Sequence, residues 1–150
     1  MAIPARKIFR INPADEDDRI AVGIDLPMVK ASGAPFPQTR LTIDAAKANL
    51  KNLILTRKGE RPFHPELGTS IYDFLFDPNM DEMMVNIEEE ISNAITKFLP
   101  YVIVTDLIVA VADQSYGFSD NFNGVRISIS FTLAGNRFDE ESIVVVIGAE

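Results

Sequence analysis

The sequence contains no cysteine, no tryptophan and a single histidine, His64, among its 150 residues. Without cysteine, disulfides and thiol chemistry are excluded, and the chain fits a reducing cytoplasm. One histidine without cysteine also makes a zinc site a poor interpretation. No apolar run approaches the roughly 18 residues that a membrane span needs. We therefore expect neither a metal site nor a membrane partner.

Charge is unevenly distributed along the chain. The net charge of −8 disfavours binding to nucleic acid. Residues 40–61 contain six basic and two acidic residues, whereas residues 77–96 contain six acidic residues and no basic residue. These segments could be solvated helix faces of opposite sign, or docking surfaces for two different partners.

Residues 1–40 have the composition of an irregular arm. Prolines are spread through this segment, and residues 15–18 form a short acidic run that we expect to be solvated. Residues 19–26 alternate loosely between apolar and polar side chains, which is compatible with one strand. We divide the chain into this N-terminal arm, 1–40, and a single domain, 41–150.

Helical periodicity predicts two main helices in the domain. The first covers residues 43–55, with Thr42 or Asp44 as its expected cap. The second covers residues 79–99 and ends at Pro100. A short turn at residues 70–76 lies between them. The apolar positions of the second helix follow a spacing of three and four throughout: Met80, Met83, Met84, Ile87, Ile91, Ala94, Ile95 and Phe98.

The last third of the chain predicts β-structure. Three strands, at residues 102–112, 125–133 and 142–147, are expected to form an antiparallel meander with the helices packed on one side, which is an α+β fold. The middle strand alternates cleanly, so one of its faces should be buried. The last strand is apolar at every position from Ile143 through Val144, Val145 and Val146 to Ile147. It is either central and covered on both faces, or an edge that a partner strand could extend.

The segment between the predicted helices, residues 56–68, predicts a shaped loop. Pro62 restricts the backbone, and Arg61 presents a planar fork of donors beside the apolar anchor Phe63. Together with Arg57 and Glu60, these residues form a candidate partner-binding site. The alternative is an internal clamp, in which Glu60 and Arg61 fasten the loop to its own domain.

This region also carries a resemblance to a known family. The motif comprises residues 53–62 (Leu-Ile-Leu-Thr-Arg-Lys-Gly-Glu-Arg-Pro), then Pro65-Glu66-Leu67-Gly68 and Leu75-Phe76. It resembles the signature of the phage baseplate wedge and sheath-initiator family of contractile tails, which has relatives in type VI secretion.

The resemblance implies a structural assembly protein of the virion tail baseplate, made in the host cytoplasm. Its Gly-Glu-Arg-Pro loop would dock on the helical core bundle formed by other baseplate wedge proteins. Its sheet would initiate the tail sheath by accepting strands from the sheath protein.

An enzymatic alternative follows from paired carboxylates. Glu60 and Glu66 flank the loop, and some family members carry a lysozyme label, so a tail-associated peptidoglycan hydrolase is the competing hypothesis. Neighbouring basic residues favour ionised carboxylates and argue against a general acid. His64 has no nucleophile motif beside it, and no phosphate-binding or dinucleotide fingerprint is present. We therefore expect no cofactor and no small-molecule substrate. A third hypothesis is an α+β adaptor whose similarity is accidental.

Overall fold

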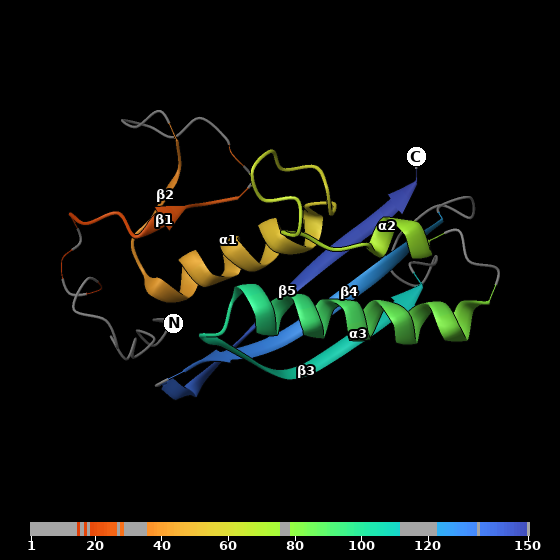
Figure 1. Cartoon of the computed structure of the whole chain (residues 1–150). Coiled ribbons are helices and arrows are strands. Elements are labelled where there is room, and N and C mark those ends of the chain that lie inside the picture. The colour runs from red at the N-terminus through yellow and green to blue at the C-terminus, as the bar shows by residue number, and fades with distance from the viewer. Residues whose placement is uncertain are drawn as a thin grey trace.

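The computed structural model describes residues 15, 17, 19–26, 28, 36–75, 79–111, 123–134 and 136–149, apart from the side chains of residues 81, 123, 136–139 and 149. Its elements are, in order, β1 (Gly23–Ile24), β2 (Gln38–Thr39), α1 (Thr42–Leu55), α2 (Ile71–Phe74), α3 (Met80–Phe98), β3 (Val102–Val111), β4 (Asn123–Leu133) and β5 (Asn136–Ala149). Both main helices lie on one side of the C-terminal sheet (Figure 1). The predicted α+β fold is confirmed. Among the described residues, no helix is long and apolar enough to cross a membrane.

The sheet is an antiparallel meander with the order β3-β4-β5, so β4 is central. Alternation along β4 buries Val125, Ile127, Ile129 and Phe131 against the helices. The predicted alternation is therefore confirmed, and the layer of helices above it explains which face is apolar.

Strand β5 differs from the simplest interpretation of its sequence. Ile143, Val145 and Ile147 are buried towards the helices, whereas Val144 and Val146 are exposed on the opposite face. Among the described residues, the apolar run of β5 is therefore covered on one face only. The reason is architectural, because α1 and α3 cover only one side of the sheet (Figure 1).

The core lies between the helices and the sheet. Leu50 and Ile54 of α1 and Ile87 and Ile91 of α3 are fully buried, as the helical spacing predicts. Met80 is the exception: it is exposed because it is the first residue of α3, before the helix reaches the core. The helix faces otherwise follow the predicted periodicity.

The start of α1 is capped from a distance. The helix begins after Leu41, which makes no side-chain cap hydrogen bond. Instead, Oδ1 of Asp15 accepts hydrogen bonds from the Thr42 amide and hydroxyl, both at 2.8 Å. Asp15 is buried, so the expectation that the acidic run is entirely solvated was wrong. The expected local cap was also wrong, because a residue 27 positions earlier supplies the acceptor.

The N-terminal segment contributes a small ribbon beside α1. β1 and β2 pair antiparallel, with Gly23 opposite Thr39. A Cβ atom at Gly23 would lie 2.9 Å from the Thr39 hydroxyl and 3.1 Å from the Ala45 side chain. Glycine thus permits the ribbon to approach the helix closely. The strand suggested at residues 19–26 is present over two of them.

Candidate docking surfaces

The loop that follows α1 is closed by its own backbone. Thr69 returns beside the helix end, where its amide donates to the Thr56 carbonyl at 2.9 Å and its carbonyl accepts from the Lys58 amide at 3.2 Å. Inside the loop, the Gly59 amide donates to the Pro65 carbonyl at 2.8 Å. These bonds satisfy backbone groups that an irregular segment would otherwise leave to solvent. The loop is therefore a shaped scaffold for the side chains that it presents.

Gly68 is the position at which this closure demands glycine. Its φ is +123°, and a Cβ atom there would lie 2.4 Å from the Thr56 carbonyl oxygen. Both the backbone angle and the space exclude a larger residue. The close approach of residue 68 to the end of α1 holds the two ends of the loop together.

Glu60 and Arg61 bind different groups rather than each other. Oε2 of Glu60 accepts from the Arg57 amide at 3.1 Å, which fixes the start of the loop. Nη2 of Arg61 donates to Oδ1 of Asn52, on α1, at 3.0 Å. Both side chains therefore fasten the loop internally, as the clamp interpretation requires. Arg61 retains further donors, because a guanidinium has five N–H groups.

Basic residues at the start of the loop tie it to the neighbouring helices. The Arg57 guanidinium lies 3.9 Å from the centre of the Tyr72 ring, in cation–π geometry. The Lys58 ammonium forms an ion pair with Glu90 of α3. The same Glu90 carboxylate accepts from the Ser70 amide at 3.1 Å. The loop is thus held against α2 and α3 as well as α1.

The side chain of Phe63 is exposed to solvent and is not packed into the core of its own domain. Its side chain is 97% exposed, and its φ of 72° is unfavourable for a residue other than glycine. It borders an open groove of about 520 Å³ lined by residues 63–67 and by Phe98 of α3. An exposed aromatic ring on a hydrogen-bonded loop has the form of a binding anchor.

The two carboxylates of the hydrolase hypothesis are already engaged. Glu66, at the rim of this groove, forms an ion pair with Lys97 at 2.7 Å. The hydrogen bond and the charge of Lys97 lower the pKa of Glu66 below its usual value. A general acid needs a raised pKa, so the shift has the wrong direction for that role. Glu60 serves as an acceptor for the loop backbone.

The two edges of the sheet are built differently. β3 carries a β-bulge between Val104 and Asp106, and it places the exposed charge of Asp106 on its edge. Both features obstruct the addition of another strand. β5 spans 14 residues, longer than most strands, and residues 142–149 contain no charge and no proline. In the described sheet, β4 is its one neighbour. Both outer strands are edges of the described sheet, and residues 142–149 of β5 form the less protected of the two.

Comparison with known proteins identifies the family to which this chain belongs. The family model for "Baseplate wedge protein gp25" matches residues 43–137, which includes α1 apart from Thr42, the loop, α3, β3, β4 and the first two residues of β5. The chain belongs to the gp25 baseplate wedge family. A relative of that name from Enterobacteria phage T4 is 36% identical over 106 residues, covering 69% of this chain and 73% of the T4 protein. Membership makes the chain a structural component of contractile-tail baseplates and confirms the resemblance.

Solved structures share the fold of this gp25-family chain. A chain of the anti-feeding prophage baseplate matches with a TM-score of 0.60 and 23% identity, over 77% of this chain and 86% of that chain. A chain of the type VI secretion baseplate complex matches with a TM-score of 0.53 and 14% identity, over 72% and 93%. A Geobacter sulfurreducens protein described as a tail lysozyme matches with a TM-score of 0.55 and 18% identity, over 67% and 85%. At these identities the likeness shows the fold alone.

The predicted site residues fall on two separate surfaces. The structure places Arg57, Glu60, Arg61, Pro62 and Phe63 on the loop, and Ile143 to Ile147 on the edge strand β5. Sequence reasoning missed the groups that support the loop, Asn52 and Lys97, because helix-surface polar residues carry no signal of their partners. Gly68 could have been found, since a glycine ending a constrained loop often marks an unusual backbone angle.

Proposed function

We propose that this gp25-family chain is a non-enzymatic assembly protein, resident in the tail baseplate, that links the wedge to the first ring of the tail sheath. Its loop docks on a helical core bundle of other wedge proteins, and its sheet accepts a strand from the sheath protein at β5. No nucleic acid, membrane or small molecule takes part in this function. The difference between the two sheet edges carries the sheath half of the proposal, and Phe63 carries the wedge half.

The proposed binding of a sheath strand rests on the unpaired backbone groups of an edge strand. A strand without a second neighbour presents a row of unpaired amides and carbonyls, which proteins normally blunt with charge, proline or a bulge. β3 has such protection, whereas the last eight residues of β5 lack it. Addition of a strand at β5 would extend the sheet to four strands and satisfy those groups.

The proposed docking on the wedge rests on the free-energy cost of holding Phe63 exposed at a positive φ. Its positive φ costs the free protein on the order of 1 kcal/mol, and its ring remains in water. Neither feature stabilises the chain alone, and both are accounted for if a partner buries the ring. The neighbouring Arg61 has donors left over for the carbonyl ends or carboxylates of a helical bundle.

Co-elution with purified wedge proteins tests the docking loop. We expect Phe63→Asn to abolish binding to the helical partner while the melting temperature stays the same or rises, because asparagine tolerates a positive φ. Val85→Asn, at another exposed apolar position on α3, is the matched control and should bind as wild type. Undiminished binding by Phe63→Asn would refute the docking role of this ring.

The hydrolase alternative is tested with the same preparations. We expect no cleavage of peptidoglycan by the wild-type protein or by Glu60→Gln and Glu66→Gln. Cleavage by the wild type that either substitution abolishes would show that the chain is an enzyme and would overturn the proposal of a purely structural role.

A further inference from the structure

We propose that the strand added at β5 is selected for acidic side chains on the face that meets α1, with Lys51 as the selecting residue. This inference rests on the proposed function, because it takes strand addition at β5 as given. It adds the chemistry of the partner: an extended segment with carboxylates on one face.

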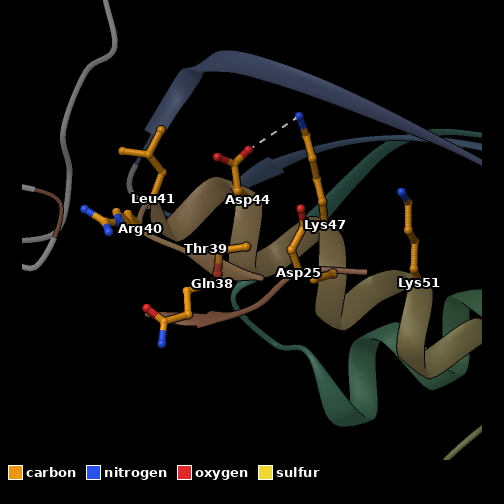
Figure 2. A pocket seen from close by; sticks show the side chains of 9 residues that line it. Asp25, Gln38, Thr39, Arg40, Leu41, Asp44, Lys47 and Lys51 are labelled. Carbon is orange, nitrogen blue, oxygen red and sulfur yellow. Dashed lines mark ion pairs between the residues drawn. The ribbon is translucent and has the colours of Figure 1, made fainter. Parts of the chain in front are cut away.

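Helix α1 packs beside β5, at one edge of the sheet. The Lys47 ammonium reaches Oε2 of Glu141 on that strand at 2.9 Å. Figure 2 shows the side chains of Asp44, Lys47 and Lys51 projecting from the same side of α1. Residues four apart on a helix are neighbours on one face. A strand laid beside β5 would therefore have the basic side of α1 over one of its faces.

The existing charges on this side of α1 are balanced except for Lys51. Lys47 pairs with Glu141 and lies 3.9 Å from Asp44. The Asp25 carboxylate accepts from the Leu26 amide at 2.8 Å. Lys51 is half-buried and, within the described part of the chain, forms no ion pair. It is thus the cation that is available to a new partner.

There is room for the partner side chain beside Lys51. An open hollow of about 490 Å³ lies between the β1–β2 ribbon and α1. The residues that line it are drawn in Figure 2: Asp25, Gln38, Thr39, Arg40, Leu41, Asp44, Lys47, Ala48 and Lys51. Ala48, which lies between the two lysines in the sequence, contributes only a methyl group to this lining. A carboxylate from an added strand could enter there without displacing a core residue.

Loss of water from Lys51 on binding would make the site prefer an acidic partner side chain. A strand docked beside β5 removes water from Lys51, and a charge that loses water is costly unless it is paired. A facing carboxylate compensates for that loss, whereas a facing lysine adds repulsion. Discrimination against the wrong charge therefore sets the specificity of the edge, while the backbone ladder supplies its affinity.

Titration with designed peptides tests this selection. We would use ten-residue peptides of alternating valine and threonine, in which two central threonines on one face are replaced by glutamate, glutamine or lysine. Amide shifts of the ¹⁵N-labelled protein locate binding along β5 and report affinity. At low salt we expect the glutamate peptide to bind at least about fivefold more tightly than the lysine peptide.

Two protein variants assign that preference to Lys51. Lys51→Gln should reduce the preference for glutamate to twofold or less, whereas Lys97→Gln, which changes the net charge equally on α3, should retain it. An unperturbed spectrum of each free variant shows that it is folded. A preference that survives Lys51→Gln overturns the inference.

The outcomes separate this inference from the function on which it rests. Equal binding of all three peptides at β5 would overturn the charge selection and leave strand addition intact. Absence of any shift along β5 with every peptide would overturn both. Shifts at β5 that depend on glutamate and on Lys51 would support both.

Discussion

Two glycines in the docking loop have different reasons to be glycine. Gly68 combines a φ of +123° with a carbonyl oxygen where its Cβ would lie, whereas Gly59 has a φ of +86° and open space around it. The loop therefore tolerates a side chain at one of these positions much better than at the other.

Replacing these glycines should separate strain from steric overlap. We expect Gly68→Ala to lower the free energy of unfolding by at least about 2 kcal/mol, because strain and overlap add. Gly59→Ala should cost about 1 kcal/mol, from the positive φ alone. Denaturant unfolding of both variants measures the difference. Equal losses would mean that the approach of residue 68 to α1 is not the constraint.

The Lys97–Glu66 ion pair makes a prediction about titration. Lys97→Gln should raise the pKa of Glu66 towards its usual value, because its hydrogen bond and charge lower that pKa. Since the folded-state pKa is depressed, the pair stabilises the fold above the ordinary carboxyl pKa and this effect is lost as pH falls through the lowered value. NMR titration of the Glu66 side-chain carboxyl tests this. An unchanged pKa in Lys97→Gln would contradict the assigned cause.

At the scale of elements, the spacing of apolar residues predicted the elements that bury one face against the core. Both main helices follow from an apolar spacing of 3.6 and β4 from a spacing of 2, because each buries one face, whereas β3 and β5 are indicated by their runs of apolar, largely β-branched residues. The cap of α1 could not be predicted this way, since Asp15 reaches Thr42 across 27 residues. The bond from Arg61 to Asn52 likewise depends on how the loop folds back. The first six residues of β5, 136–141, have no apolar run to indicate a strand.

The cap of α1 yields a prediction at the same scale. Asp15→Ala should destabilise the protein by about 1 kcal/mol, because the Thr42 amide loses its acceptor at the positive end of the helix dipole. Asp17→Ala is the control from the same acidic run: its carboxylate bonds only the nearby Arg19 amide among the contacts described. Its effect should stay within about 0.5 kcal/mol. Thermal unfolding compares the two, and equal effects would show that Asp15 is not a cap of consequence.

At the scale of the whole molecule, the fold places its two proposed contacts on different elements. The loop projects beyond the end of α1, whereas β5 belongs to the C-terminal sheet (Figure 1). A helical partner at the loop and an added strand at β5 could therefore bind together. The asymmetry of the sheet edges directs the added strand to one side only.

The central claim, that β5 is the edge at which the sheath strand is added, is tested most directly by co-assembly of the purified protein with its sheath protein. Val144→Lys/Val146→Lys places two charges on β5 at positions that are 46% and 37% exposed, and Ile103→Lys/Ile108→Lys is the matched change on β3, at positions 43% and 53% exposed. Each pair should cost no more than about 1 kcal/mol of stability. We predict that the β5 variant loses co-assembly while the β3 variant retains it. Retention by the β5 variant, or equal loss by both, would contradict the account.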